Sequence, residues 1–307
     1  MPVIEALDLI YEYNPGRGVC GLSMSVGRGE CYAILGRNGS GKSTLTRLIL
    51  GLKRHQSGQL NVLGRLVRGR SRQMLEKVGA VLDTSPHWEN LSGFQNVFFA
   101  ASSYGMSRRQ AEVRVKELLD RSGLKDQAHE PVGTYSFGMR RKLSLIQAFV
   151  SDPELMVMDE PTAGVDAHFM AAMTEMIRAR CEAGKTTFIT SNDPEWLAGT
   201  VSQVAFMEAG QIIEQGTVDE LVARVSTLTE VRISLEDYFR LPDPVLAGIR
   251  SFTQTGNVAT VFMDKDPLLI PRLIEWISQE GRKIRAIETL GNSLREVFLL
   301  RTGKELE

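Results

Sequence analysis

The stretch Gly36-Arg-Asn-Gly-Ser-Gly-Lys-Ser43, with Glu30-Cys-Tyr-Ala-Ile-Leu35 directly before it, decides the fold of this chain. The run before the glycines is short and apolar, which predicts a buried strand. After the loop, apolar residues recur at i, i+3, i+4 and i+7, which predicts a helix with one apolar face. These residues are Leu45, Leu48, Ile49 and Leu52. A strand, a glycine-rich loop and a helix in this order form the setting that a phosphate-binding loop requires.

The glycine-rich loop has the residue types that bind phosphate groups. It matches the pattern GxxxxGK[ST], in which glycines let backbone N–H groups turn inward and the next helix points its positive dipole end at the same place. Lys42 can supply a charge to the β- and γ-phosphate oxygens of a nucleotide, and the Ser43 hydroxyl can ligate Mg²⁺. The alternative is a glycine-rich turn with an incidental lysine, but the neighbouring strand and helix favour the phosphate site.

Two carboxylates end another predicted buried strand. The apolar run 155–158 leads directly into Asp159 and Glu160, and ligands bind beyond the carboxyl ends of the strands in open α/β sheets. Asp159 can hold Mg²⁺ through water, and Glu160 can act as a general base toward an attacking water. Solvated acids at the end of a strand are the alternative interpretation.

A second candidate anion site begins a predicted helix over 138–150. Ser136 and Gly138 offer a hydroxyl group and free backbone N–H groups at the positive end of that helix. A plain N-cap uses the same serine, so both interpretations stay open. Basic residues at this end are unfavourable for the helix dipole, which suggests either a negative neighbour or a solvated charged face. These residues are Arg140, Arg141 and Lys142.

Strands and helices alternate over roughly the first 220 residues, and this alternation predicts a mainly parallel α/β layer structure. One of the expected helices covers 107–122 and begins with a capping box of Ser107 and Gln110. Beyond about residue 224 the pattern changes to a short mixture of strand-like and helix-like segments, typical of a small separate α+β unit. The predicted domains are therefore 1–224 and 225–307.

The composition is that of an ordinary globular protein and argues against several classes of function. The 307 residues include 36 Lys and Arg against 37 Asp and Glu, so the charge gives no support to nucleic-acid binding. The cysteines Cys20, Cys31 and Cys181 form no CxxC pair, which favours a reducing compartment over a disulfide framework or a zinc site. The N-terminus shows no secretory signal, and no run of 18 or more apolar residues predicts a membrane span.

Taken in order, these motifs resemble those of the ATP-binding subunit of an ABC transporter, over about residues 3–224. The glycine-rich loop is similar to the Walker A motif, LMVMDEP (155–161) to the Walker B strand, YSFGM (135–139) to the signature motif and AGVD (163–166) to the D-loop. Tyr13 matches the aromatic residue that stacks on adenine, with a core or surface tyrosine as the alternative. The nucleotide-binding residues that the resemblance implies are Tyr13, Gly36, Asn38, Gly39, Ser40, Gly41, Lys42, Ser43, Thr44, Ser136, Gly138, Met139 and Asp166.

The resemblance also implies a fold, cofactors and a dimer. The fold is an α/β P-loop ATPase domain with a helical subdomain at about 88–150, and the cofactors are ATP and Mg²⁺. Two identical or two different cassettes would form a head-to-tail dimer. Ser136 and Gly138 of one subunit would then close over the γ-phosphate that Lys42 of the other subunit holds.

The same resemblance implies partners and a place in the cell. We expect ATP hydrolysis to drive a separate transmembrane permease from a peripheral position on the cytoplasmic face of the cell membrane, with no nucleic acid involved. The C-terminal unit resembles the tail of ATPase subunits from bacterial exporters with separate permease chains, which favours export. In the family, the segment that here contains Trp88, Phe94, Phe98 and Phe99 holds a groove for a helix of the permease, and plain core packing is the alternative.

Two positions depart from the family pattern. Asp83 stands where the family's Q-loop has a glutamine, and Gln95 lies too far downstream to replace it. A carboxylate at this place can still reach Mg²⁺ or its water, so Asp83 is a candidate metal and catalytic residue. Asn192 stands where the family usually has a histidine. It can donate a hydrogen bond to the γ-phosphate but carries no charge, and a simple polar strand end is the alternative.

These departures leave a second function open. With Asn192 and Asp83 in place of the usual residues, the chain could be the weak or regulatory half of a heterodimer, which binds ATP with little turnover. A soluble ABC ATPase of DNA repair or translation is a third alternative. The chain lacks the long heptad insertion of the DNA-repair ATPases and the tandem second cassette of the translation ATPases.

Overall fold

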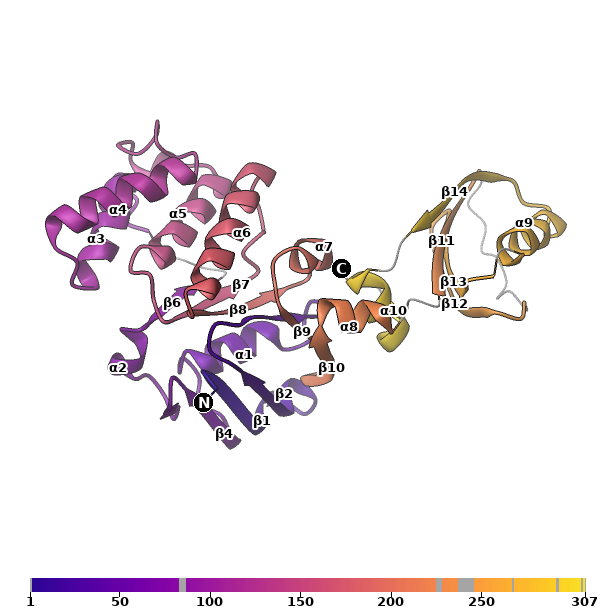
Figure 1. Ribbon diagram of the computed structural model, residues 1–307, viewed down its shortest axis with the longest axis horizontal. Coiled ribbons are helices and arrows are strands. Elements are labelled where there is room, and N and C mark those ends of the chain that lie inside the picture. Colours follow the sequence, from indigo (N-terminus) through magenta and orange to yellow (C-terminus); the bar gives the residue numbers. More distant parts are fainter. Residues whose placement is uncertain are drawn as a thin grey trace. The chain divides into compact units, whose positions relative to one another are not determined.

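The computed structural model describes residues 2–82, 87–224, 228–236, 246–266, 268–290, 293–304 and 306. They form two compact units, which divide between Gly216 and Thr217. This division falls ahead of residue 224, where the sequence predicts the domain limit, because helix α8 (Val218–Ala223) contacts helix α10 (Leu294–Thr302) of the C-terminal unit. Figure 1 shows the elements of each unit.

A six-stranded sheet forms the centre of the first unit, in the order β10-β9-β3-β8-β7-β6. Its strands are β3 (Cys31–Leu35), β6 (Val78–Val81), β7 (Leu155–Asp159), β8 (Thr186–Ser191), β9 (Gln203–Glu208) and β10 (Gln211–Thr217). The register pairs β6, β7, β8, β3 and β9 in parallel. All residues of β3 and β7 are buried, which explains why both strands are continuous apolar runs in the sequence up to Asp159. The predicted α/β class is confirmed.

A second sheet of the first unit is antiparallel and was not predicted from the sequence. It has the order β2-β1-β4-β5, with β1 (Ile4–Asn14), β2 (Arg17–Val26), β4 (Ser57–Val62) and β5 (Arg65–Leu66). Helix α1 (Lys42–Ile49) contacts β2 of this sheet and both β7 and β8 of the six-stranded sheet. The helix that follows the glycine-rich loop is therefore packed on both sides.

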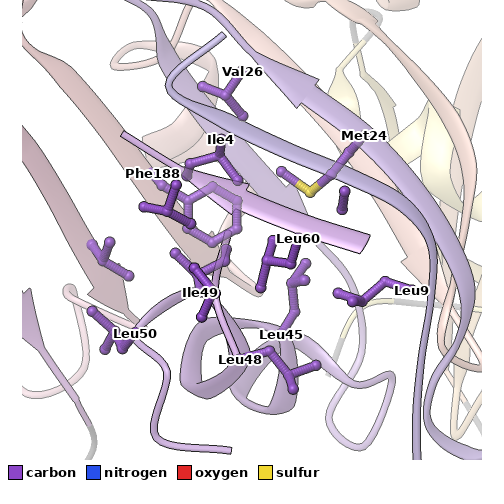
Figure 2. Packing of buried hydrophobic residues seen from close by; sticks show 14 of the residues in the cluster. Ile4, Leu9, Met24, Val26, Leu45, Leu48, Ile49, Leu50, Leu60 and Phe188 are labelled. Carbon is purple, nitrogen blue, oxygen red and sulfur yellow. The ribbon is translucent and has the colours of Figure 1, made fainter. Parts of the chain in front are cut away.

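The apolar face of α1 forms part of the main core. Leu45, Leu48 and Ile49 are fully buried and pack with residues of both sheets (Figure 2). The neighbours shown there include Ile4 and Leu9 of β1, Met24 and Val26 of β2, Leu60 of β4 and Phe188 of β8. Leu52, the fourth residue predicted for this face, lies beyond the end of the helix and is 36% exposed. Gly51 adopts φ +66° directly after the helix, a conformation that ends helices and that the spacing pattern did not reveal.

Helices α3, α4 and α5 gather on one side of the first unit (Figure 1). The unit contains α2 (Arg72–Leu75), α3 (Gly93–Ser103), α4 (Arg108–Arg121), the 3₁₀ turn η1 (Val132–Thr134), α5 (Phe137–Phe149), α6 (Ala167–Glu182) and α7 (Pro194–Ala198). The predicted helix over 107–122 is confirmed as α4, and its capping box of Ser107 and Gln110 is present. Contacts of α3 with both α4 and α5 hold these helices together.

The C-terminal unit combines an antiparallel sheet with helices, as expected for an α+β unit. The sheet order is β12-β13-β11-β14, with β11 (Leu228–Leu235), β12 (Ile249–Thr255), β13 (Val258–Asp264) and β14 (Ile284–Leu290). Helix α9 (Leu269–Gln279) covers one face, where its Leu269, Leu273 and Ile277 join the apolar residues of β11 and β13 (Figure 1). None of the helices in the described part of the chain has the length and apolar character of a membrane span.

Candidate functional site

The glycine-rich loop joins β3 to α1 and lines a cavity of about 330 Å³. Gly41, the N-cap of α1, adopts φ +110°, and a Cβ atom there would lie 2.2 Å from the carbonyl oxygen of Gly18. A Cβ atom on Gly36 would lie 2.5 Å from the carbonyl oxygen of Met207. Both glycines are therefore required by close backbone contacts. Within the described residues no side chain caps α1, which leaves its first N–H groups for an anion.

Most of the residues predicted to bind the nucleotide meet at this cavity. Its lining includes Tyr13, Asn38, Gly39, Gly41, Lys42, Ser43, Thr44 and Glu160. Gly36, Ser40 and Asp159 do not line the cavity. The carbonyl oxygen of Gly36 accepts a hydrogen bond from Lys42, and Ser40 and Asp159 are buried. The sequence analysis missed Arg17 and Gly18, which also line the cavity. Both lie where β2 begins, and β2 packs against α1, with the carbonyl oxygen of Gly18 close to Gly41 of the loop.

Lys42 and Glu160 form an ion pair at the cavity. Lys42 is only 5% exposed, and its Nζ lies 3.1 Å from Glu160 Oε1. The same Nζ donates hydrogen bonds to the carbonyl oxygens of Gly36, at 2.6 Å, and Arg37, at 3.2 Å. Glu160 Oε2 accepts a hydrogen bond of 3.0 Å from the backbone N–H of Asn192. Burial raises the pKa of Glu160 above its ordinary value, and the charge of Lys42 opposes that rise in part.

Side chains from two other elements hold the end of β7, one at the Asp159 carboxylate and one at the backbone. Thr190 of β8 donates its hydroxyl to Asp159 Oδ1. Arg141 of α5 is 7% exposed and donates to the carbonyl oxygens of Asp159 and Glu160, at 2.6 Å each, and of Leu82, at 2.8 Å. Glu160 itself adopts φ +46°, a strained conformation for a residue other than glycine. These contacts fix the two carboxylates beyond the end of the sheet.

The signature-like segment forms a second cluster with the D-loop-like segment. Ser136 is the N-cap of α5 and accepts a hydrogen bond of 3.2 Å from the backbone N–H of Met139. A Cβ atom on Gly138 would lie 2.6 Å from the carbonyl oxygen of Gly164, so the two segments touch through their backbones. Asp166 is the N-cap of α6. None of the described residues of this cluster lines the cavity of the same chain.

The three basic residues at the start of α5 have different partners. Lys142 Nζ lies 2.5 Å from Asp166 Oδ2, and this hydrogen bond is the main cause that lowers the pKa of Asp166. Arg140 lies 3.5 Å from Glu89. Lys142 and Arg140 therefore each lie near a carboxylate, whereas Arg141 donates hydrogen bonds to the carbonyl oxygens at the end of β7.

Tyr13 stands at the cavity edge and is 51% exposed. Its ring packs edge-to-face against Tyr11, with ring centroids 5.1 Å apart. Lys53 Nζ lies 4.6 Å from the Tyr13 ring centroid, within reach of a cation–π contact. An exposed ring beside a phosphate loop is available to stack on a flat ligand, and its role there stays a prediction.

Of the two departures from the family pattern, Asn192 belongs to the described residues and Asp83 does not. Asp83 lies in 83–86, outside the described residues. Gln95 accepts a hydrogen bond of 2.9 Å from the backbone N–H of Ser92 and belongs to the capping box of α3, so it has a structural partner there. Asn192 follows β8 and reaches the site through its backbone N–H on Glu160. A contact of its side chain with a phosphate stays a prediction.

The aromatic segment near α3 forms two ring pairs. Trp88 and Phe99 pack edge-to-face with centroids 4.5 Å apart, and each is about half exposed. Phe94 and Phe98 stack at 5.9 Å. The rings thus pack on one another and leave apolar surface in contact with solvent. The prediction of a groove for a permease helix stays a prediction.

Comparison with known proteins gives the family of this chain. The family model described as ABC transporter matches residues 19–163. The Nod factor export ATP-binding protein I of Rhizobium sp. (strain N33) is 32% identical over 94% of this chain and 93% of its own length. The daunorubicin/doxorubicin resistance ATP-binding protein DrrA of Streptomyces peucetius is 30% identical over 98% of this chain and 92% of its own length.

Solved structures agree with this result at the level of the fold. A structure of an ATP-binding subunit of an ABC transporter has a TM-score of 0.67 at 24% identity and covers 72% of this chain and 92% of that chain. A dimeric ATP-binding cassette in a post-hydrolysis state, bound to ADP and Pi, has a TM-score of 0.63 at 18% identity and covers 70% of this chain and 98% of that chain. This chain belongs to the ABC transporter family as an ATP-binding subunit that hydrolyses ATP to drive transport.

Proposed function

We propose that this chain is the ATPase subunit of an exporter whose membrane permease is a separate chain. The observation that carries the proposal is the extent of the likeness. The export and resistance ATP-binding proteins named above match this chain over 94% and 98% of its length, so the C-terminal unit is included as well as the cassette. The ATPase would act as a peripheral subunit on the cytoplasmic face of the membrane, because ATP is supplied there.

ATP fits the cavity that the glycine-rich loop lines. Its adenine would stack on the exposed ring of Tyr13, and its phosphates would accept hydrogen bonds from the loop N–H groups and from Lys42. Mg²⁺ also fits the residues present, since Ser43 lines the cavity and Asp159 lies at the adjoining strand end. A hydroxyl, one carboxylate, phosphate oxygens and water are the oxygen ligands that Mg²⁺ accepts. The bound ion would neutralise charge on the β- and γ-phosphates.

The ion pair of Lys42 and Glu160 suggests how the site changes when ATP binds. Phosphate oxygens compete with the Glu160 carboxylate for the same ammonium group, since Nζ lies 3.1 Å from Oε1. When Lys42 turns to the phosphates, Glu160 loses its counter-charge and can accept a proton from an attacking water. The hydrogen bond from the Asn192 backbone then keeps the carboxylate aimed at the cavity. Without a charged side chain at Asn192, and with Asp83 in the Q-loop position, we expect slow turnover.

We propose that Ser136 and Gly138 complete the site of a second subunit. In their own chain they do not line the described cavity, and the Ser136 hydroxyl caps α5 by accepting a hydrogen bond from the backbone N–H of Met139. Their N–H groups at the start of a 13-residue helix provide an anion site that a facing subunit can use. This arrangement needs a head-to-tail dimer, formed with a second copy or a related cassette.

Mixing two inactive variants tests this arrangement. Lys42→Ala and Ser136→Ala should each lose hydrolysis when purified alone. In a mixed head-to-tail dimer, one site combines the intact Lys42 of one chain with the intact Ser136 of the other. A 1:1 mixture should therefore recover roughly a quarter of the wild-type phosphate release, because about half of the dimers are mixed and each has one intact site. If the mixture stays as inactive as the separate variants, the two residues do not act across a dimer.

The link to an exporter is tested with the membrane protein encoded beside this chain. Co-expression of a tagged chain should retain that protein through detergent extraction, and ATP hydrolysis should rise when both are reconstituted in vesicles. Ser107→Ala is the control. Ser107 is the N-cap of α4 and does not line the cavity, so this variant should still retain the membrane protein. An ATPase that neither retains a membrane protein nor responds to one would contradict the proposal.

A further inference from the structure

Two of the three cysteines meet in the first unit, although 150 positions separate Cys31 from Cys181 in the sequence. Cys31 begins β3, and Cys181 lies in the last turn of α6. Helix α6 contacts β3, and each of the two thiols shifts the pKa of the other, so the side chains are neighbours. Thr187 of β8 is the register partner of Cys31, and Cys181 Sγ donates to its hydroxyl at 3.6 Å. Neighbouring strands and a helix end therefore bring both cysteines to Thr187, close to each other.

A buried arginine stands next to this thiol pair. Arg180 is 5% exposed, and its Nη2 donates to the carbonyl oxygen of Pro153 at 2.7 Å. Among the described residues, its Nε and Nη1 have no hydrogen-bond partner. The positive charge of Arg180 helps to lower the pKa of Cys181, whereas Cys181 and burial raise the pKa of Cys31 well above its ordinary value despite the same charge. A guanidinium with unused donors is suited to stabilise an anion that forms beside it.

We propose that Cys181 and Cys31 form an oxidation site, where a hydroperoxide converts the two thiols into a disulfide between the end of α6 and the start of β3. The thiolate of Cys181 attacks the peroxide, so that an S–O bond forms, the O–O bond breaks and the leaving oxygen takes up a proton as water or an alcohol. Cys31 then attacks the resulting sulfenic sulfur, an S–S bond forms, and water leaves with the Cys31 proton. The two sulfurs lose two electrons in total, and the peroxide gains them.

Exposure and acidity assign the two roles. Cys181 is partly exposed and can meet a small oxidant, whereas Cys31 is 4% exposed and can only follow as the resolving thiol. The hydrogen bond from Cys31 is the main cause that lowers the pKa of Cys181 to about 7, and Thr187 and Arg180 act in the same direction. A large share of Cys181 is therefore thiolate near neutral pH, the form that reacts.

Cys20 supplies a control within the same chain. It is also partly exposed, but burial and a hydrogen bond of 3.4 Å to Glu12 raise its pKa. A carboxylate neighbour disfavours the thiolate, so Cys20 should react slowly with the same oxidant. The comparison of Cys181 with Cys20 thus separates a specific site from general oxidation of accessible thiols.

The test is a time course of the reduced full-length chain with hydrogen peroxide, quenched with N-ethylmaleimide and digested without reduction. Mass spectrometry should find a peptide that joins Cys31 to Cys181, lighter than the two thiol peptides by about 2 Da for the two hydrogens lost. Cys181 should be consumed at least tenfold faster than Cys20, and dithiothreitol should restore both thiols. Equal rates at Cys181 and Cys20, or oxidation of Cys181 to sulfinic acid without the joined peptide, would overturn the proposal.

Variants separate the two steps. Cys31→Ser should let dimedone trap a sulfenic acid on Cys181, because the resolving thiol is missing, while Cys20→Ser should leave the wild-type rate unchanged. Cys181→Ser should protect Cys31 from the oxidant. Rapid oxidation of Cys31 in the Cys181→Ser chain would contradict the assigned order. The wild-type time course decides the proposal even if a cysteine variant fails to fold. The site uses no residue that lines the ATP cavity, so its outcome is independent of the proposed exporter function.

Discussion

At the scale of single residues, the ion pair of Lys42 and Glu160 joins the residue proposed to bind phosphate to the residue proposed as the base in ATP hydrolysis. Lys42 has three oxygen partners within 3.2 Å, and only the carboxylate of Glu160 among them carries a full charge. A phosphate that approaches the loop must compete with this carboxylate. The pair therefore costs some binding affinity, while it keeps the proposed base close to the place where the γ-phosphate would lie.

The Glu160→Gln variant should separate these two effects. Its amide keeps the size of the side chain but cannot take a proton from water, so the hydrolysis rate should fall about 10²- to 10⁴-fold. Nucleotide affinity should rise, because Lys42 no longer has a carboxylate partner. Phosphate release and fluorescent-nucleotide titration measure the two quantities.

The matched control for this change is Glu154→Gln, which removes an exposed carboxylate 2.7 Å from Lys77 in the same unit. It should leave both quantities near wild type, since exposed ion pairs contribute little. A Glu160→Gln chain with wild-type hydrolysis would remove Glu160 from the role of base.

At the scale of elements, Arg141 connects α5 to the end of β7. Its guanidinium donates to three backbone carbonyl oxygens, of Leu82, Asp159 and Glu160. These carbonyls belong to segments that come from different parts of the chain. A flat group with several donors in fixed directions can satisfy all three at once, and a lysine ammonium on a flexible stem holds them less well.

The Arg141→Lys variant should lower the free energy of unfolding by about 2–4 kcal/mol, because hydrogen bonds from a buried charged group are lost. The hydrolysis rate should fall more than the affinity for ATP, since the backbone that carries Glu160 loosens while the glycine-rich loop is untouched. Urea unfolding and steady-state kinetics give the two results.

Arg108→Lys is the control, since Arg108 is exposed on α4 and contacts Glu112 only one turn away. A change of less than about 0.5 kcal/mol is expected there. Equal effects of the two substitutions would show that Arg141 does not hold the end of β7.

Local rules explain which elements the sequence could predict. The capping box of Ser107 and Gln110 marked the start of α4, and the apolar run before Asp159 marked β7, because both signals lie within a few residues. The antiparallel sheet of β1, β2 and β4 was missed because its pairing joins residues as distant as Ile4 and Val62. Arg141 and the Cys31–Cys181 pair depend on such distant contacts, and no local pattern marks them, whereas the turn before Arg17 is a local signal that the sequence analysis did not use.

The same distinction holds for the site. The glycine-rich loop and Lys42 could be predicted because one strand, one turn and one helix fix their spacing, and Glu160 because it directly follows the apolar run of β7. Tyr13 was placed by family resemblance alone, and its position at the cavity depends on the unpredicted sheet. The proposed place of Ser136 and Gly138 in a partner's site would be a property of an assembly, which a single chain does not contain.

At the scale of the whole molecule, the C-terminal unit has an ionisable pair of its own. Glu230 of β11 and Glu296 of α10 are 3% and 2% exposed, and Glu230 is near enough for its charge to raise the pKa of Glu296. Arg232 Nε lies 2.8 Å from Glu230 Oε1, and Glu296 Oε2 accepts from the backbone N–H of Ser293 at 3.0 Å. Burial and a neighbouring negative charge both favour the protonated form of the Glu296 carboxyl group.

This pair makes the stability of the C-terminal unit depend on pH. Burial, with the Glu230 charge as a further cause, raises the pKa of Glu296 from 4.5 to about 7. The folded unit thus holds a proton that the unfolded chain releases near pH 4.5. The stabilisation is complete below that value and is lost as pH rises through 7, by about 3 kcal/mol in all. Hydrogen exchange of peptides from β11 and α10 in the full chain should therefore be slowest near pH 5, after correction for intrinsic exchange rates.

The Glu296→Gln variant should remove this dependence, because its amide still accepts the Ser293 hydrogen bond at the helix cap but has no proton to lose. Its protection at pH 8 should equal or exceed that of the wild type, whereas at pH 5 the two chains should differ little. Glu288→Gln, on an exposed position of β14, is the matched control and should keep the wild-type pH profile. A Glu296→Gln chain that loses protection between pH 5 and 8 as the wild type does would show that other groups set the pH response of this unit.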